Sequence, residues 1–335
     1  MKKINYLIAG LAVPFALALQ GCSDGGASGS TEAGNGSAGD AENEEYPVRD
    51  IEMVVGWGAG GGSDTFARAI AAELSDILDT NINVVNNEGA SGAIAGDYVQ
   101  EQDPDGYTFW AISSNYPINV AQGNTPHGLD TYTPIGRVQD DIVTIQTKGG
   151  EFEDIEDFLD TARNETITVG GTGSLGFDEL ILTQMELEAD VDFNFVPYES
   201  AGEMHAALLG GHIDAQVEQF SPTIGQVEAG EIDILLAFND ESVPGYEDVP
   251  YSMQYGWEVT EGQNRGLVVH SDTPDYIVDI LVEALEEAKE QPRYKEYEED
   301  SYLHLRDGWL PSDDWAAELE NVVANYEELL EVLGQ

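Results

Sequence analysis

The stretch Val55-Gly56-Trp57-Gly58-Ala59-Gly60-Gly61-Gly62-Ser63-Asp64 joins two segments of different periodicity. Residues 50–55 before it form a short apolar run that is typical of a buried strand. Apolar residues after it, from Phe66 to Ile77, recur at spacings of four, four and three, and predict a helix with Ser63 or Asp64 as its N-cap. The backbone N–H groups of such a turn, together with the helix dipole, favour a bound carboxylate or phosphate, although the same glycines can serve close packing alone.

Two further glycine turns repeat this arrangement. Asn87-Glu88-Gly89-Ala90-Ser91-Gly92 follows an expected strand at 82–85, and Gly170-Gly171-Thr172-Gly173-Ser174-Leu175-Gly176 follows an expected strand at 167–169. The carboxyl ends of parallel strands share one edge of a sheet, so turns placed there can face one crevice. Three such turns in one chain therefore predict a shared anion site.

Strands and helices alternate along the rest of the chain, which predicts two α/β domains, each a mostly parallel sheet flanked by helices. The first domain is expected to combine residues 47–141 with 239–335, and the second to comprise 142–238. Two amphipathic helices near the C-terminus, one after Thr273-Pro274 and one from Ser312, are expected to cover the sheet of the first domain.

The N-terminus predicts export. Lys2 and Lys3 precede an apolar stretch from Leu7 to Leu19, which is too short to cross a bilayer as a helix. The single cysteine, Cys22, follows this stretch directly, in a segment that resembles the lipobox of bacterial lipoproteins. We therefore expect a signal peptide at 1–21, acylation of Cys22 and a flexible tether at 22–46 rich in Gly, Ser and acids. A plain signal peptide with a chance cysteine is the alternative.

The charge of the chain indicates its solvent and excludes one class of partner. The sequence has 65 acidic and 12 basic residues, a formal charge of −53, yet 41% of its residues are hydrophobic, as in a globular protein. So acidic a surface repels nucleic acid. Its self-repulsion is screened at molar salt, where the Debye length is about 3 Å. We interpret the charge as salt adaptation of the halophilic type.

Other classes of protein remain to be weighed. Gly56, Gly58 and Gly61 satisfy the dinucleotide pattern G-x-G-x-x-G, but free nicotinamide cofactors are not expected outside the cytoplasm, so we expect no cofactor. An exported hydrolase would need a nucleophile elbow or a metal motif. The chain contains no G-x-S-x-G sequence, and its five histidines form no H-E-x-x-H pair. A sensory or adhesive surface lipoprotein would share the anchor and tether.

The motifs together resemble the Bug family, the substrate-binding components of tripartite tricarboxylate transporters, from about Pro47 to the C-terminus. The resemblance rests on motifs in the same order and at similar spacing: Gly60-Gly61-Gly62-Ser63-Asp64, Gly89-Ala90-Ser91-Gly92, Pro104-Asp105-Gly106-Tyr107-Thr108, Gly171-Thr172-Gly173-Ser174, Pro197-Tyr198, Leu209-Gly210-Gly211-His212-Ile213-Asp214 and Thr273-Pro274. It implies a periplasmic-binding-protein-like clamp of two domains that is not an enzyme. The ligand carboxylate would be held largely by backbone N–H groups and ordered water.

The resemblance also implies particular ligand-binding residues. They come from the three glycine turns and from two later segments: Trp57, Gly60, Gly61, Asp64, Ala90, Ser91, Thr172, Gly173, Ser174, Tyr198 and Asp214. Asp64 can serve as a helix cap as well. Arg68, one turn into the first helix, is expected to form a solvated or interdomain ion pair.

Three residues beside the expected cleft depart from the family pattern. Gly56 and Glu88 stand where the family usually has proline, and Phe177 where it often has histidine. The ligand can therefore differ from a tricarboxylate. We expect a monomeric, lipid-anchored, extracytoplasmic protein that captures a small organic acid, with no metal, and passes it to membrane transporter subunits.

Overall fold

The computed structural model describes residues 45–198 and 200–332 of the chain. The predicted signal peptide, Cys22 and the predicted tether up to residue 44 lie outside the described residues. Within the described part, no helix is both long and apolar enough to cross a membrane.

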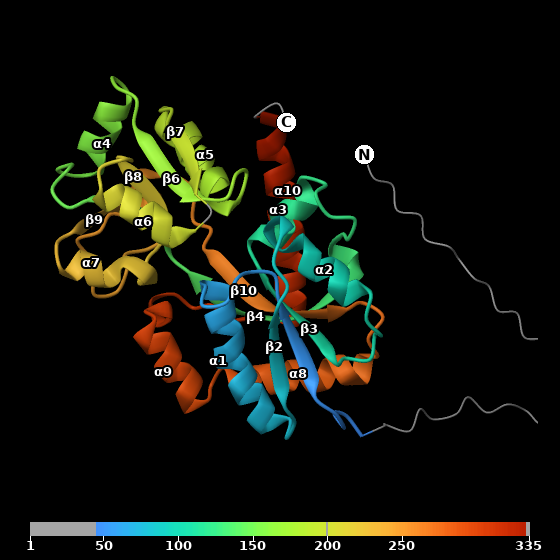
Figure 1. Ribbon diagram of the computed structural model, residues 1–335. Coiled ribbons are helices and arrows are strands. Elements are labelled where there is room, and N and C mark those ends of the chain that lie inside the picture. The colour runs from blue at the N-terminus through green and yellow to red at the C-terminus, as the bar shows by residue number, and fades with distance from the viewer. Residues whose placement is uncertain (1–44, 199, 333–335) are drawn as a thin grey trace, which may run out of the picture. The chain divides into compact units, whose positions relative to one another are not determined.

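The first lobe is built on a six-stranded sheet with the order β11-β4-β10-β3-β1-β2 (Figure 1). Strand β1 pairs in parallel with β2 and β3, whereas β10 pairs antiparallel with β3 and β4, and β11 antiparallel with β4. The strands are β1 (Ile51–Val55), β2 (Ile82–Asn86), β3 (Thr108–Ser113), β4 (Tyr132–Asp141), β10 (Gln263–His270) and β11 (Leu310–Pro311).

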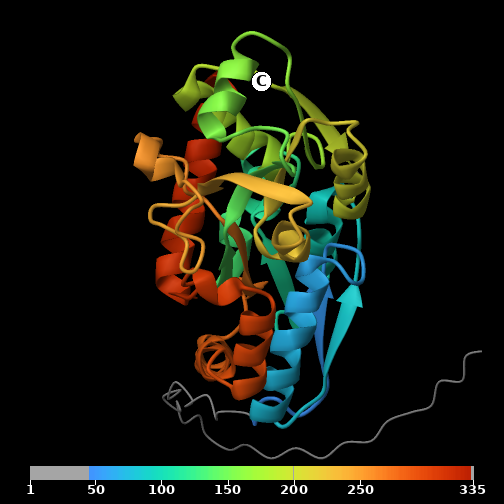
Figure 2. The ribbon, with the colours of Figure 1, turned by 90° about the vertical axis from the view of Figure 1, so that its left-hand side faces the viewer.

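Helices cover both faces of this sheet, because alternate strand residues point to opposite faces. Met53 and Val55 of β1 pack with helices α1 (Gly62–Ile77), α8 (Asp275–Ala288) and α9 (Pro292–Asp300), which lie together in Figure 2. Val54, between them, faces a separate core. That core is covered by α2 (Ala93–Gln100), α3 (Asn115–Ala121) and the first half of α10 (Ser312–Val332). Short 3₁₀ turns lie at η1 (Ala90–Gly92), η2 (Leu129–Thr131) and η5 (Leu303–Leu305).

The second lobe has a five-stranded sheet with the order β7-β6-β8-β5-β9. Its strands are β5 (Val143–Lys148), β6 (Thr168–Thr172), β7 (Asn194–Tyr198), β8 (Ala215–Gln219) and β9 (Ile232–Phe238). Strand β6 pairs in parallel with β7 and β8, whereas β5 pairs antiparallel with β8 and β9. The helices are α4 (Ile155–Ala162), α5 (Phe177–Ala189), α6 (Ala201–Leu209) and α7 (Ile224–Glu228), with 3₁₀ turns η3 (Ser221–Thr223) and η4 (Ser252–Tyr255).

Two α/β lobes were predicted correctly, but both sheets are mixed instead of mostly parallel. The sheets are mixed because β5 and β10 each follow a segment in which the chain crosses from one lobe to the other. Strands β1, β2, β3, β6, β7 and β8 end at the junction between the lobes, whereas β5 and β10 begin there. A strand that begins at the junction must run opposite to the strands that end there. Each lobe therefore gains antiparallel pairs around its entering strand.

The chain after β9 stays with the second lobe for some twenty residues that were assigned to the first domain. Tyr251 forms an isolated bridge with Ala237 of β9. Trp257 and Val259 belong to the core that β5 and α5 share. By these contacts the segment 239–259 packs on the second sheet, and the return to the first lobe comes at about Thr260.

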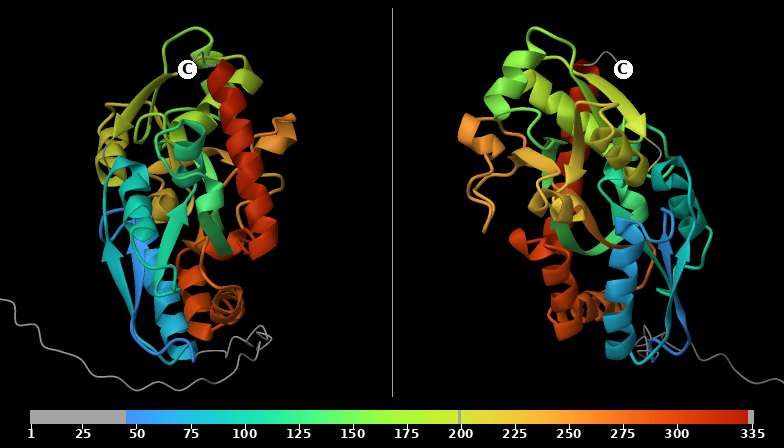
Figure 3. Two further views of the ribbon diagram at one scale, coloured as in Figure 1. Left: turned by 90° about the vertical axis from the view of Figure 1, so that its right-hand side faces the viewer. Right: turned by 60° about the vertical axis from the view of Figure 1, so that its left-hand side comes forward.

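Helix α10 packs on both lobes, whereas the sequence analysis placed it on the first alone. Trp315 and Leu319 in its first half are buried against the first sheet. Tyr326, Leu329 and Leu330 in its second half are buried in the core of the second lobe. Figure 3 shows the helix running from one lobe to the other. The apolar stripe of α10 is therefore divided between two cores.

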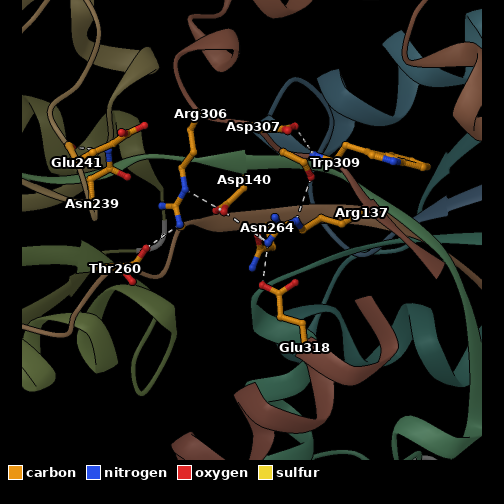
Figure 4. A network of polar contacts seen from close by, with 12 residues as sticks. Arg137, Asp140, Asn239, Glu241, Thr260, Asn264, Arg306, Asp307, Trp309 and Glu318 are labelled. Atoms are coloured by element: carbon orange, nitrogen blue, oxygen red, sulfur yellow. Dashed lines mark hydrogen bonds and ion pairs between the residues drawn. The ribbon is translucent and has the colours of Figure 1, made fainter. Parts of the chain in front are cut away.

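A polar network ties α10 and the returning chain to β4 at the junction (Figure 4). Arg137 Nη1 lies 2.7 Å from Glu318 Oε1 of α10 and 3.4 Å from Asp140 Oδ2. Arg306 Nε lies 3.0 Å from the same Asp140 oxygen, and its Nη2 donates a hydrogen bond to the carbonyl of Thr260. Burial raises the pKa of Asp140, and the two arginines oppose that rise. The network therefore cross-links the segments at which the chain changes lobes.

Candidate functional site

The first glycine turn is held in shape by Asp64, which is only 2% exposed. Its carboxylate accepts hydrogen bonds from Gly60 N at 2.8 Å, Arg68 Nε at 2.9 Å and Asn86 Nδ2 at 2.9 Å. The hydrogen bond from Arg68, followed by those from Gly60 and Asn86, outweighs burial and lowers the pKa of Asp64 to about 2. Asp64 is therefore a permanently charged anchor of the turn, and Arg68 pairs with it inside the first lobe.

Helix α1 begins at Gly62, with Gly61 as its N-cap and no side-chain cap, so its N-cap lies two residues before Ser63 and three before Asp64, the two predicted caps. Asp64 lies in the first helical turn and closes the loop in front of the helix. The first N–H groups of a helix have no acceptor within the helix, so those of Gly62, Ser63 and Asp64 are left for another partner. Gly60, Gly61 and Gly62 are exposed. This helix end can accept an anion.

The second glycine turn lies directly against the first. A Cβ built on Gly56 would stand 2.7 Å from Gly92 Cα, so this close approach of the two turns requires glycine at position 56. Three successive residues, Ala90, Ser91 and Gly92, have φ of 47°, 50° and 93°. Such angles strain the two non-glycine residues, so the surrounding contacts must hold the turn in place. The side chain of Trp57 lies near Gly92 and helps to do so.

The third glycine turn is built in the same manner around a buried acid. Thr172 donates two hydrogen bonds to Asp178 Oδ2, from its N–H at 2.7 Å and from its hydroxyl at 2.6 Å. Gly173 N donates to the carbonyl of Tyr198 at 3.0 Å. Burial raises the pKa of Asp178 to about 7, against the lowering effect of the two Thr172 bonds. Gly173 and Ser174 at the tip are exposed.

Helix α3 brings the second and third turns together across the junction. Asn119 Nδ2 donates to the carbonyl of Ser91 at 2.9 Å, and Gln122 Nε2 donates to the carbonyl of Leu175 at 2.6 Å. Asn119 lies in the last turn of α3, and Gln122 is the C-cap residue of this helix. A Cβ built on Gly176 would lie 3.5 Å from Asn115 Oδ1. The three glycine turns, from two lobes, therefore gather at one junction.

Two predicted residues lie elsewhere or serve another purpose. Asp214 accepts a hydrogen bond from Thr168 N at 2.7 Å, at the amino end of β6. The register of β6 on β8 places it there, four residues or roughly 13 Å from Thr172 at the carboxyl end. Asp214 is therefore outside the site. The ring of Tyr198 packs over Gly170, next to Met204, and is partly core.

The structure shows where Phe177 and Glu88 lie, two residues that depart from the pattern of the Bug family. Phe177 is buried in the core of the second lobe. It therefore does not alter the exposed tip of the third turn. Glu88 is exposed, and its carboxylate would lie 3.5 Å from a Cβ on Gly58. This negative charge borders the first turn, where water screens it.

Arg265 lies beside the first glycine turn and was not among the residues named from the sequence. It lies on β10 and is 6% exposed, and its Nη2 would stand 2.6 Å from a Cβ built on Gly62, the first residue of α1. The nearby Asp141 is buried, and burial raises its pKa to about 7, although the positive charge of Arg265 opposes the rise. Basic residues are rare in this chain, with 12 lysines and arginines in total, so each of them could have been considered as a possible anion contact.

The glycine turns offer backbone hydrogen-bond donors, and Arg265 adds a positive charge beside them. Exposed backbone at the three turns, the free N–H groups of α1 and the guanidinium of Arg265 all suit a small anion. In the described part of the chain, no group of three or more His, Cys, Asp or Glu side chains is placed to hold a metal ion.

Known proteins resemble this chain in sequence and in fold. The family model TctC, described as the tripartite tricarboxylate transporter family receptor, matches residues 66–311. A protein of Cupriavidus necator, named for its place in the gbd 5′ region, is 25% identical over 315 residues, which cover 88% of this chain and 90% of that protein.

Solved structures share the fold. A TctC solute-binding protein from Polaromonas is 27% identical, with a TM-score of 0.74 over 86% of this chain and 99% of that one. MatC from Rhodopseudomonas palustris, solved with bound malate, is 24% identical, with a TM-score of 0.73 over 85% of this chain and 99% of that one. With its sequence matched by the family model over most of its length, the chain belongs to the TctC family, the receptors of tripartite tricarboxylate transporters.

Proposed function

We propose that this receptor captures a small organic acid, a di- or tricarboxylate, in a cleft between its two lobes. The observation that supports the proposal is the set of contacts between the exposed glycine turns: Gly56 of the first lies against Gly92 of the second, and α3 with its C-cap contacts the second and third. Their N–H groups suit a carboxylate, and the malate-bound relative shows a dicarboxylate held in the same fold.

Capture depends on closure of the clamp. The first and second turns belong to one lobe and the third to the other, so a ligand touching all three stabilises the closed arrangement. We propose that the lobes, taken as 47–141 with 260–335 and 142–259, rotate about the crossings near Ile142 and Thr260. The closed form is then the one that the membrane subunits of the transporter recognise.

The test is calorimetric titration of the purified protein with mono-, di- and tricarboxylates in high-salt buffer. We expect at least one di- or tricarboxylate to bind, and Gly61→Val to weaken that binding. Gly61 has φ of −78°, and a Cβ there meets only Gly58 O at 3.4 Å, so the variant should keep its fold. An unchanged melting temperature without ligand is the control. Binding by Gly61→Val as tight as that of the unmodified protein contradicts a site at the first turn.

We further propose an extracytoplasmic, lipid-anchored monomer. The support is the sequence from Lys2 to Cys22, with the acidic, glycine-rich segment that follows it. Cell fractionation tests the anchor: Cys22→Ser should move the protein from the membrane to the soluble fraction, and mass spectrometry should find the acyl group on Cys22. A Cys22→Ser protein that stays with the membrane argues against a lipid anchor. Light scattering measures the oligomeric state.

A further inference from the structure

The guanidinium of Arg265 lies at the amino end of α1, beside Gly62. A Cβ built on Gly62 would stand 2.6 Å from Arg265 Nη2 and 3.2 Å from Arg265 Cζ. Side chains in the first turn of a helix point back toward the N-terminus. The guanidinium therefore borders the free N–H groups of a helix of 16 residues.

The guanidinium has few partners of its own. Arg265 is 94% buried, and its Nε is shielded from solvent without a hydrogen-bond acceptor among the described residues. Its Nη1 reaches Gln139 Oε1 only at 3.4 Å. An arginine carries five N–H donors, and a buried donor left without an acceptor costs free energy. The side chain is thus held ready for an acceptor that the described residues do not supply.

Within residues 45–198 and 200–332, Arg265 also forms no ion pair within 4.0 Å, although the chain has 65 acidic residues. Every other lysine and arginine of the described part lies within 4.0 Å of a carboxylate, except the exposed Lys148. Asp141 lies near Arg265, but its carboxylate forms no ion pair with the guanidinium within 4.0 Å. The positive end of the α1 dipole lies beside the same cation. The carboxylate of Asp64, in the first turn of α1, is already engaged by Gly60, Arg68 and Asn86, so it leaves the guanidinium of Arg265 free for another acceptor.

We propose that Arg265 binds a carboxylate of the ligand, together with the N–H groups at the start of α1. The assignment rests on the proposed function and adds a specificity-determining residue to a site otherwise made of backbone. A guanidinium presents a planar fork that matches an ionised carboxylate in a bidentate manner. It therefore selects a free acid over its amide or ester at this end of the ligand.

The test compares Arg265→Gln with Arg163→Gln by calorimetric titration with malate and with the tightest acid of the panel. Arg163 is an exposed residue at the end of α4 and loses the same charge on substitution. We expect Arg265→Gln to bind about 10- to 100-fold more weakly, and Arg163→Gln to bind as the unmodified protein does. Arg265→Lys keeps the charge without the fork and should fall between them.

A second substitution covers the case in which Arg265→Gln fails to fold. In Gly62→Ala the added methyl group would displace the flexible end of Arg265 and leave the backbone N–H groups in place. It should weaken binding by the same mechanism. In the unmodified protein, the amide of the bound acid should also bind more weakly than the acid itself.

The possible outcomes separate the two proposals. If the unmodified protein binds a carboxylate and both Arg265→Gln and Gly62→Ala bind it equally well, the assignment of Arg265 is overturned and the proposed function stands. If Arg265→Gln lowers only the melting temperature, with affinity unchanged, the side chain supports the fold alone. If the unmodified protein binds no carboxylate, the proposed function fails, and this assignment fails with it.

Discussion

Asp64 and Asp178 hold the first and third glycine turns in the same way, but their pKa values are shifted in opposite directions. Each is an aspartate in the first turn of a helix, and each accepts hydrogen bonds from the glycine turn before it. Arg68 keeps Asp64 ionised and lowers its pKa to about 2. No cation faces Asp178 among the causes of its shift, and burial raises its pKa to about 7. The two turns therefore respond differently to pH.

We predict that Asp178→Asn removes part of the pH dependence of stability. The pKa of Asp178 is raised from 3.8 to about 7 in the folded protein, so the folded state holds a proton that the unfolded chain releases. The stabilisation is present below pH 3.8 and is lost as the pH rises through about 7. Between these values the group contributes a slope of up to about 1.4 kcal/mol per pH unit to the free energy of unfolding.

Urea unfolding across this pH window measures the effect. The free energy of unfolding should fall less steeply with rising pH in Asp178→Asn than in the unmodified protein. Asp248 is exposed, so Asp248→Asn is the matched control and should keep the original slope. Equal slopes in all three proteins would mean that Asp178 is ionised in the folded state.

At the scale of single elements, local patterns in the sequence predicted strands, turns and helices correctly. They did not predict how distant strands pair with one another. The strand, glycine turn and helix from Ile51 to Ile77 follow from periodicity and turn chemistry alone. The direction of β10 depends on where the chain re-enters the lobe, which no local pattern records. Asp214 was misplaced for the same reason, because only the register of β8 on β6 shows which end of the sheet it occupies.

The glycine turns of the candidate site can be identified from the sequence, but the side chains beside them cannot. Gly56 of the first turn lies against Gly92 of the second, and Asn119 and Gln122 donate hydrogen bonds to the second and third turns. Arg265 was hidden, because a lone arginine in a strand has no pattern until Gly62 is seen beside it. Helix α10 was a similar case, since a continuous apolar stripe does not reveal that two different cores cover it.

We predict that α10 couples the stability of the two lobes. Leu319 is buried in the first lobe and Leu330 in the second, at 7% and 8% exposure. Replacement of a buried leucine by alanine costs about 2–5 kcal/mol. Leu319→Ala and Leu330→Ala should each lower the free energy of unfolding by such an amount, within one cooperative transition. Denaturant unfolding checks this, and a Leu330→Ala protein as stable as the original would show that α10 serves the first lobe only.

At the scale of the whole molecule, the ion pairs neutralise only a small part of the charge. The formal charge is −53, and the basic residues are largely engaged by carboxylates already. Helix α8 carries exposed acids such as Glu283 and Glu286, with no basic residue in its last turn. Like charges on a helix surface repel one another. We therefore expect the stability of the folded state to depend on ions in the solvent.

We predict that stability rises steeply with salt. The Debye length falls from about 10 Å at 0.1 M to about 3 Å at 1 M, so repulsion between exposed carboxylates is largely screened at the higher concentration. The midpoint of thermal unfolding should rise by about 10 °C between these concentrations of KCl, which corresponds to a few kcal/mol for a chain of this size. Differential scanning calorimetry measures it.

The double variant Glu283→Gln and Glu286→Gln separates charge screening from a general strengthening of the hydrophobic effect by salt. Both side chains are exposed, so the substitutions remove two charges without altering the core. If repulsion is the cause, the variant is more stable than the original at 0.1 M KCl and the difference shrinks at 1 M, because screening leaves less repulsion to relieve. If salt acts only on apolar surface, the two proteins gain equally with salt and their difference stays constant. A constant difference would remove the basis for interpreting the acidic surface as salt adaptation.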